Sequence, residues 1–181
     1  MIFSPTPLSG SFSIDLNPFS DERGWFARYY CKNEFKEIGH DAEWVQMNHS
    51  FTKHLGSVRG MHYQEGEYKE IKLVRCIAGK VYDVIIDIRK DSPSFLKWFG
   101  IELSAENKKM LYIPAGFAHG FQCLSDNCEL IYHHSAFYTP GRETGISYND
   151  PAVNIEWPIE ITVISERDKN HPFITNNFKG I

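Results

Sequence analysis

The amino-acid sequence predicts an all-β domain of the sandwich, jelly-roll or barrel class, with short helices at its periphery. Runs rich in β-branched and aromatic residues follow one another from Ile71 onward, each bounded by Gly, Pro, Asp or Asn. They recur at a spacing of about 8 to 12 residues, as in such all-β folds. Only residues 33–38 and 166–170 look helical, the first with Asn33 as a candidate N-cap and Gly39 as its C-terminal stop.

The expected strands are short, and one pair of them is separated by a turn signal. Ala78 and Gly79 predict a tight hairpin between the strands on either side. Within 80–89, alternation places Asp83 and Asp87 on the face opposite to an apolar one, so we expect one core face and one charged face. The expected strands are 44–48, 71–77, 80–89, 98–103, 110–114, 117–124 and 129–135.

Length and composition indicate one globular domain without a polyanionic partner. The 181 residues are 42% hydrophobic and 23% charged, the ordinary balance of a globular protein. A chain of this length buries roughly 70% of its unfolded surface, so we assign 1–181 to one domain, with a frayed tail from about 176. The net charge of -4 gives no basic field for nucleic acid or an anionic membrane.

The cysteines and the absence of long apolar runs predict a cytoplasmic protein. No run approaches the ~18 to 20 apolar residues of a membrane span, and the first residues do not resemble a signal peptide. The four cysteines include no CxxC pair, and Cys76 and Cys123 fall in expected strands, where a thiol usually behaves as a small buried hydrophobe. We therefore expect reduced thiols and no metal site of the zinc-finger kind.

Residues able to do chemistry concentrate in a few strands. Arg59-Gly-Met-His62 packs a cation, a glycine and an imidazole into four residues, which suits a strand whose backbone comes close to an anion. Alternation places Lys72 on the strand face opposite to that of Arg75. It places His119 between two phenylalanines on one face, and Tyr132 on the same face as His134. If these faces meet inside a barrel, they form a pocket for a polar, anionic small molecule.

Several motifs together resemble the dTDP-4-dehydrorhamnose 3,5-epimerase family, in its order and with its spacing. They are Asp21-Glu-Arg-Gly-Trp-Phe26, Arg59-Gly-Met-His-Tyr-Gln64, Lys72-Leu-Val-Arg75, Ile113-Pro-Ala-Gly-Phe-Ala-His-Gly-Phe121 and Asn149-Asp-Pro followed by Ile155-Glu-Trp-Pro158. The resemblance implies a cupin-type jelly-roll barrel, a homodimer in which the partner's N-terminal segment helps to line each pocket, and no metal or organic cofactor. It also implies a nucleotide-linked 4-keto-6-deoxyhexose as substrate, most simply dTDP-4-dehydro-6-deoxy-D-glucose, converted to dTDP-4-dehydro-L-rhamnose.

The reaction that the resemblance implies requires three kinds of group. A base removes a proton next to the C4 ketone, a cation stabilises the enolate oxygen, and an acid returns a proton from the opposite face. By resemblance, His62 is the base, Lys72 the cation and Tyr132 the acid, while Asp168 orients the base. Asp168 also follows Ser165 at the spacing of a capping box, so a helix-capping role is the alternative.

The resemblance also implies a set of substrate contacts. Arg59 and Arg23 match contacts to the diphosphate, which guanidinium groups bind with two parallel hydrogen bonds. His119 and Asn48 match polar contacts, and Tyr138 matches the aromatic ring that stacks on the base. The remaining expected contacts are Phe26, Glu143 and Arg167.

Three departures from the family pattern leave the substrate open. Position 28 is Arg, where the family commonly has an acidic residue. The segment that begins at the expected general acid reads Tyr132-His-His-Ser135, and the loop 64–70 ends in Glu70. An enzyme acting on another nucleotide sugar, such as a CDP-linked one, or inverting C3 or C5 alone, therefore stays open. A non-catalytic sugar-nucleotide-binding cupin is a further alternative, although the base and acid are both present.

A metal-dependent cupin is a less favoured alternative. Such sites need a clustered ligand set, typically His-x-His with a nearby carboxylate. Gln64 stands two residues after His62, and the adjacent His133 and His134 point to opposite faces of an expected strand. The sequence therefore gives no metal ligands.

Overall fold

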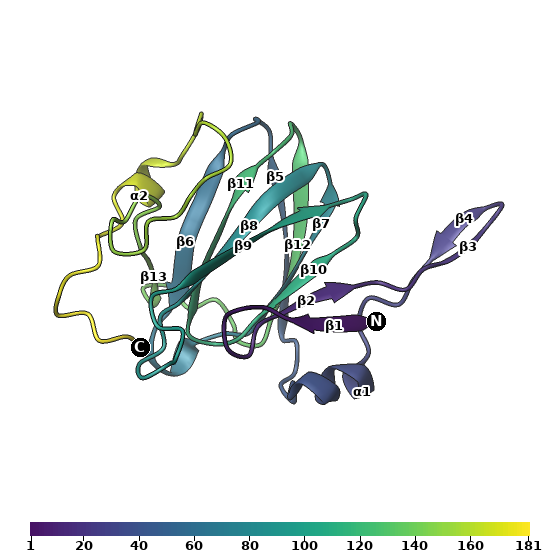
Figure 1. The fold of residues 1–181 in the computed structure, drawn as a ribbon, viewed down its shortest axis with the longest axis horizontal. Coiled ribbons are helices and arrows are strands. Elements are labelled where there is room, and N and C mark those ends of the chain that lie inside the picture. Colours follow the sequence, from purple (N-terminus) through teal and green to yellow (C-terminus); the bar gives the residue numbers. More distant parts are fainter.

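A computed structural model describes residues 1–181, and β-strands make up most of the regular structure (Figure 1). The helices are short: α1 (Lys32–Phe35), η1 (Lys36–Ile38), η2 (Gly66–Tyr68) and α2 (Glu166–Lys169). The strands are β1 (Ile2–Pro5), β2 (Phe12–Asp15), β3 (Phe19–Asp21), β4 (Gly24–Phe26), β5 (Gln46–Thr52), β6 (Val58–Gln64), β7 (Lys72–Ala78), β8 (Lys80–Asp87), β9 (Trp98–Ser104), β10 (Met110–Ile113), β11 (Phe117–Cys123), β12 (Cys128–His134) and β13 (Glu143–Gly145).

The strands form two antiparallel sheets that face each other. One is six-stranded in the order β1-β2-β10-β7-β12-β5, and the other is five-stranded in the order β13-β6-β11-β8-β9. Neighbours in space are mostly distant in sequence, because the chain passes repeatedly from one sheet to the other. The predicted all-β jelly roll with short peripheral helices is thereby confirmed.

The core has a layer between the sheets and a further layer on each outer face. The inner layer joins Val74 and Leu130 of the six-stranded sheet to Ile85 and Phe121 of the five-stranded one. Phe35 of α1 packs with buried side chains on the outer face of the six-stranded sheet. Residues from 146 onward cover the outer face of the five-stranded sheet. Each sheet is therefore buried on both faces over much of its area.

The expected hairpin at Ala78 and Gly79 is wrong. β7 and β8 belong to different sheets, so the chain crosses between the sheets at this point instead of turning back on its own partner. Gly79 has a φ of +69°, and a Cβ there would lie 2.6 Å from the Ser125 hydroxyl oxygen. A tight glycine turn suits either connection, and the sequence signal does not distinguish them.

The expected division of β8 into a core face and a charged face is also incomplete. Both faces are buried: Val84 and Ile86 face the outer layer, whereas Ile85 lies between the sheets. Asp83 and Asp87 are fully buried on that inner side, each with a charged or imidazole partner. A closed two-sheet fold gives β8 no solvent-facing side.

The helices and the C-terminal tail differ from expectation in detail. Gly39 ends the first helical segment with a φ of +80°, as predicted, but the N-cap is Cys31 rather than Asn33 and makes no side-chain cap. The expected fraying from about residue 176 is wrong. The Ile181 N–H donates to the Ile88 carbonyl at 2.8 Å, and the tail packs against the outer core layer.

One element extends away from the two sheets. β3 and β4 form a separate hairpin that projects from the body beside the N-terminus (Figure 1). Its aromatic side chains Phe19, Trp25 and Phe26 are exposed. A two-stranded hairpin has little stability of its own in water, so its shape and apolar surface suit a contact with another chain. No helix is both long and apolar enough to cross a membrane.

We expect the buried Asp87 to stabilise the fold in a pH-dependent way. Burial raises its pKa, but hydrogen bonds from Arg89, Ser92 and Ser94 outweigh burial and lower the pKa from 3.8 to about 2. The stabilisation is complete above the unfolded value of 3.8 and is lost as the pH falls towards 2. Asp87→Asn should therefore lower the free energy of unfolding by roughly 2 kcal/mol at pH 7, measured by urea denaturation. An equal difference between variant and wild type at pH 7 and pH 2.5 would contradict this assignment.

Candidate active site

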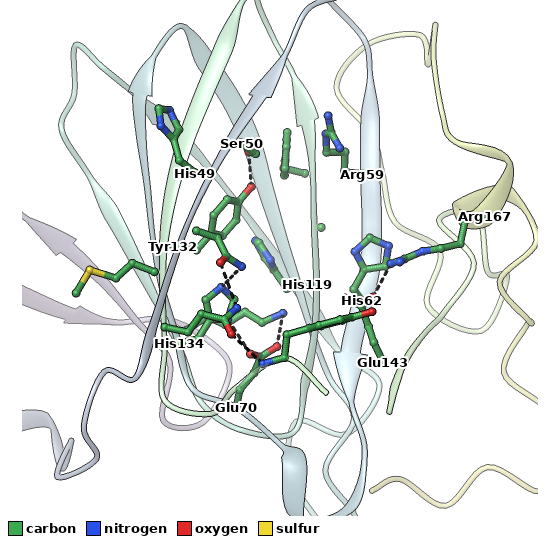
Figure 2. Close-up of a pocket in the computed structure, with 17 residues that line it drawn as sticks. His49, Ser50, Arg59, His62, Glu70, His119, Tyr132, His134, Glu143 and Arg167 are labelled. Atoms are coloured by element: carbon green, nitrogen blue, oxygen red, sulfur yellow. Dashed lines mark hydrogen bonds and ion pairs between the residues drawn. The ribbon is translucent and has the colours of Figure 1, made fainter. Parts of the chain in front are cut away.

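A cavity of about 630 Å³ opens between the two sheets and is lined from both (Figure 2). Strands β5, β7 and β12 supply one wall, and β6 and β11 supply the other. The faces that alternation predicted to carry functional groups therefore meet. The expected site residues that line the cavity are Asn48, Arg59, His62, Lys72, His119, Tyr132, Tyr138, Glu143 and Arg167.

β6 presents both Arg59 and His62 to the cavity, although they are three positions apart. In a regular strand such residues point to opposite faces. Along the β6–β11 pair, however, His62 lies opposite His119 and Arg59 lies opposite Phe121, so three steps on β6 match two on β11. This extra residue is a β-bulge, which reverses the alternation and brings both side chains to the same side.

Gly60 lies within the bulge and makes two close approaches that a side chain would prevent. Its φ is +119°, and a Cβ there would lie 2.6 Å from the Gly120 Cα. The Gly60 N–H donates to Oδ2 of Asp168 at 3.0 Å. The sequence suggested a strand whose backbone comes close to an anion, and the anion in contact is a carboxylate of the same chain.

His62 and Asp168 form a carboxylate–imidazole pair. The His62 Nε2 lies 2.9 Å from Asp168 Oδ1. Because an ionised carboxylate only accepts hydrogen bonds, Nε2 carries a proton, and in the neutral ring Nδ1 is the nitrogen that can accept one. Burial raises the pKa of Asp168, but the hydrogen bonds from His62 and Gly60 outweigh it and hold the pKa far below its ordinary value. The carboxylate stays ionised and fixes one tautomer of the ring.

The capping-box alternative for Asp168 is only half realised. Ser165 is the N-cap of α2, and its side chain accepts a hydrogen bond from the Asp168 backbone N–H at 3.1 Å. The Asp168 carboxylate does not return to the Ser165 backbone, because its two oxygens bind Gly60 and His62. The helix cap therefore places the carboxylate, and the carboxylate holds the imidazole.

Tyr132 stands on the opposite sheet from His62, on β12. Its hydroxyl lies 3.0 Å from the Ser50 hydroxyl, and its ring lies between two imidazoles, His119 at 6.2 Å and His134 at 6.1 Å between ring centroids. In Figure 2, Tyr132 and His62 lie on opposite sides of His119. Burial raises the pKa of Tyr132, so the phenol keeps its proton.

Two further polar groups point into the cavity from the neighbouring strands. His119 Nε2 lies 3.0 Å from each carboxylate oxygen of the buried Asp83. The Lys72 ammonium, almost fully buried, lies 3.1 Å from Oε1 of Glu70. Arg75, three residues after Lys72 on β7, instead contacts the rings of Trp25 and Tyr29. This confirms that Arg75 and Lys72 point to opposite faces of the sheet.

Cations lie around the opening of the cavity. The Arg59 guanidinium binds Thr52 Oγ1 at 2.9 Å and the Phe51 carbonyl at 3.1 Å, and it keeps an exposed surface. Arg167 is paired with Glu143 at 2.8 Å and also lines the cavity. An exposed arginine held by neutral partners retains its charge for a ligand, which suits a phosphate group.

Arg23 and Phe26 do not join this cavity within the chain. Both lie on the β3–β4 hairpin, where Arg23 is paired with Asp21 and is 86% exposed. The family resemblance assigned them to the substrate, and it also assigned an N-terminal segment to the partner's pocket. Within one chain the structure brings only the other expected residues together.

The sequence did not indicate several residues of the site. Glu70 and Asp83 each bind a predicted residue, and Ser50 binds Tyr132. Asp83 had a usable signal, because it alternates with Val81 and Ile85 of the inner core layer. Glu70 and Ser50 had none, since their partners are fixed by strand register between distant segments.

One group of potential metal ligands includes the imidazole–carboxylate pair. Donor atoms of His62, Asp168 and His171 all lie within 4.8 Å of one another. The Arg167 Nε, however, lies 3.6 Å from the same Asp168 oxygen that a metal would use. A fixed positive charge at that distance opposes a second cation. The group is therefore better suited to handling protons than to holding a metal.

An imidazole on one wall, whose Nδ1 can accept a proton in the neutral ring, and a protonated phenol on the other can remove and return a proton on opposite faces of a ligand. That exchange inverts a carbon without transferring any other group. The fold and the site thus define an epimerase or racemase that acts on an anionic small molecule. The family model for dTDP-4-dehydrorhamnose 3,5-epimerase matches residues 5–176, and the chain belongs to this family.

Individual relatives agree with the family model over most of the chain. The dTDP-4-dehydrorhamnose 3,5-epimerase of Shigella flexneri is 49% identical over 153 residues, 84% of either protein. The crystal structure of the enzyme from Elizabethkingia anophelis superposes with a TM-score of 0.94 at 39% identity, over 98% of either chain. A dTDP-6-deoxy-D-glucose-3,5-epimerase from Legionella pneumophila, in complex with dTDP-4-keto-L-rhamnose, gives 0.90 at 37%, covering 95% of this chain and 92% of that one. The cupin-type jelly roll implied by the resemblance is confirmed.

We expect Gly60→Ala to impair both stability and the site. A Cβ would clash with Gly120 and force a residue with a side chain to keep a φ of +119°. Backbone strain of this kind costs about 1 to 3 kcal/mol, before any loss of the Asp168 contact. Gly66→Ala is the control. Gly66 also has a positive φ, of +64°, but no atom lies within 4 Å of the added Cβ. Urea denaturation and epimerase assays should show the larger loss for Gly60→Ala, and equal losses would contradict the close approach described here.

Proposed function

We propose that this chain inverts C3 and C5 of a nucleotide-linked 4-keto-6-deoxyhexose, converting dTDP-4-dehydro-6-deoxy-D-glucose into dTDP-4-dehydro-L-rhamnose. The observation that carries the proposal is His62 of one sheet, held by Asp168 of α2, facing a cavity that Tyr132 lines from the other sheet. Membership of the family supplies the substrate class. The ligand of the Legionella enzyme, dTDP-4-keto-L-rhamnose, is the expected product.

In the first step His62 acts as the base. With Nε2 committed to Asp168, Nδ1 takes the proton from the carbon next to the C4 ketone, and the electron pair moves onto the carbonyl oxygen. The resulting imidazolium is stabilised by the Asp168 carboxylate. The Lys72 ammonium stabilises the enolate oxygen, and its burial strengthens this interaction because little water screens it.

In the second step Tyr132 acts as the acid. Its phenol donates a proton to the same carbon from the other sheet, the enolate returns to a ketone, and the configuration is inverted. The Ser50 hydroxyl stabilises the phenolate by hydrogen bonding; the phenolate then takes a proton from solvent, and a solvent water accepts the proton that His62 removed. Two rounds of this exchange, at C3 and C5, complete the reaction.

The remaining cavity residues bind the substrate in this proposal. Arg59 holds the diphosphate, and Tyr138, which also lines the cavity and is half exposed, stacks on the nucleobase. His119, fixed by Asp83, and Asn48 contact the sugar. Glu143 and Arg167, paired with each other, close the side of the cavity next to His62.

We further propose that the working unit is a homodimer in which the β3–β4 hairpin enters the partner's cavity. The hairpin projects from the body with its aromatic residues exposed, and β5 is an edge strand with exposed Met47 and Phe51 (Figure 1). Exposed apolar side chains and an unpaired strand edge are both usually covered by another protein surface. This arrangement would bring Arg23 and Phe26 of one subunit to the diphosphate and nucleobase bound by the other.

A cytoplasmic location is consistent with the thiols. All four cysteines are free, and three of them are buried. A protein matured in an oxidising compartment would commonly use such residues in disulfides. We therefore propose that the enzyme works in the cytoplasm.

An assay in deuterated buffer distinguishes the proposed role of His62 as base from that of Tyr132 as acid. We expect His62→Asn to lower the rate of deuterium incorporation at C3 and C5 by about 10²- to 10⁴-fold, because the base is lost. Tyr132→Phe should still incorporate deuterium through His62 but with retention of configuration, because the acid on the other face is lost. NMR of the sugar protons measures both quantities. Wild-type exchange in His62→Asn, or normal inversion in Tyr132→Phe, would remove the residue from its role.

The same experiment addresses the nucleotide and the number of carbons inverted. The wild-type enzyme is offered dTDP-, CDP-, GDP- and UDP-linked 4-keto-6-deoxy sugars. We expect dTDP to be preferred and both carbons to exchange. Exchange at one carbon alone would indicate a mono-epimerase, and no exchange with any of the four would indicate a non-catalytic binding protein.

Mixed dimers test the contribution of the hairpin. Arg23→Ala and His62→Asn subunits are each expected to be nearly inactive alone. After the two are unfolded and refolded together, half of the dimers should contain one subunit of each kind, with one complete site. Activity should then recover to about a quarter of the wild-type value, as random pairing of two-fold dimers requires. No recovery would mean that Arg23 acts within its own subunit, and full activity of Arg23→Ala alone would mean that Arg23 does not take part.

A further inference from the structure

Glu70 lies between two residues of the cavity and binds both. Its Oε2 accepts a hydrogen bond from His134 Nδ1 at 2.7 Å, and its Oε1 is 3.1 Å from the Lys72 ammonium (Figure 2). Glu70 precedes β7, while His134 ends β12 and lies opposite Lys72 in the register of those strands. The two segments that depart from the family pattern therefore meet in the cavity wall.

These three side chains are almost completely buried, with about one-tenth of each side chain exposed. Burial raises the pKa of Glu70, but the hydrogen bond from His134 and the charge of Lys72 outweigh it, so the pKa is lowered. Glu70 is therefore an anion held inside the protein. A buried carboxylate is tolerated only when it is fully paired, and here both of its oxygens have a partner.

The contact with Glu70 also fixes how His134 binds Asn48. Because the carboxylate only accepts, His134 carries its proton on Nδ1, and its Nε2 is an acceptor. The Asn48 side-chain nitrogen lies 3.2 Å from that Nε2 and donates to it. The Asn48 oxygen accepts in turn from Gln46 at 3.1 Å. The orientation of the Asn48 amide is thus set from Glu70 through one imidazole.

His134 contacts the proposed acid as well. Its ring stacks against Tyr132, with an angle of 27° between the planes and 6.1 Å between centroids. Loss of the Glu70 contact would free the imidazole to rotate, and with it one side of the Tyr132 ring. Glu70 and His134 therefore touch Lys72, Asn48 and Tyr132.

We propose that Glu70 and His134 form a positioning pair, which holds the Lys72 ammonium, the Asn48 amide and the Tyr132 ring in the geometry that the sugar requires. The pair acts through these residues, so the inference rests on the proposed function. Glu70 holds the ammonium in place within a wall that offers little water. His134 in turn fixes the orientation of Asn48 on β5 and packs against the ring of Tyr132.

The first test is the isosteric variant Glu70→Gln, assayed for deuterium incorporation and epimer formation. Loss of a charge-assisted contact to Lys72 should lower kcat by about ten- to a hundredfold, with KM changed less than about threefold. A role in packing alone would not lower kcat while leaving KM nearly unchanged.

The second test compares two replacements of His134. Asn can still donate to Glu70, whereas Leu cannot, so His134→Asn should retain at least about fivefold more kcat than His134→Leu. The double variant Glu70→Gln with His134→Leu should lose less than the product of the single losses, because the residues act as one unit. Simple multiplication of the two losses would show that they act independently.

A matched control exists on the same pair of strands. Glu129 of β12 binds His49 of β5 at 2.8 Å, with both side chains partly exposed. Glu129→Gln should leave kcat and KM unchanged, which separates the buried pair from a generic His–Glu contact. Near-ultraviolet circular dichroism and urea denaturation identify any variant that fails to fold.

The outcomes distinguish the two proposals. If the wild-type protein exchanges no proton, the proposed function fails. If the wild type exchanges and folded Glu70→Gln keeps the wild-type kcat, the positioning pair is wrong while the function stands. A loss confined to KM would also overturn it, because Glu70 would then act on binding rather than on the groups that take part in the reaction.

Discussion

The hydrogen bond between the Gly60 N–H and the Asp168 carboxylate is the contact on which the site depends. It joins the bulge of β6 to α2, which belongs to the layer that covers the five-stranded sheet. The bulge lets Arg59 and His62 reach one cavity, and the carboxylate then fixes the proton on the imidazole. A strand without an extra residue would send one of these side chains into the outer core. The reacting base and the nearby cation therefore share a single local irregularity.

The cavity repeats one kind of contact three times. His62, His119 and His134 each bind a carboxylate from another segment, which sets the tautomer of each ring and leaves its second nitrogen for another partner. The three carboxylates, Asp168, Asp83 and Glu70, are all buried or nearly so. Such pairs hold the imidazoles in fixed orientations. The ammonium and the guanidinium groups can then provide the positive potential that a diphosphate sugar and an enolate require.

Much of the fold followed from the sequence because regular strands obey a period of two. The faces of β11 and β12 were predicted correctly, and they placed His119 and Tyr132 inside. The prediction failed where geometry depends on distant partners. The turn at Gly79 looked like a hairpin, but whether two strands pair is decided by the whole sheet order. The bulge in β6 and the contact of Glu70 with His134 are likewise consequences of register between remote segments, which no local pattern encodes.

The position of Asp168 has a consequence for how the protein responds to heat. The carboxylate comes from a helix of only four residues, in a layer of mostly irregular chain laid over the outside of the sheet. Layers with few regular hydrogen bonds open locally at a lower free energy than the strands beneath them. When this layer lifts, the imidazole loses its orienting partner although both sheets are intact. Heating should therefore disable turnover in a molecule that still has its native β-sheet spectrum.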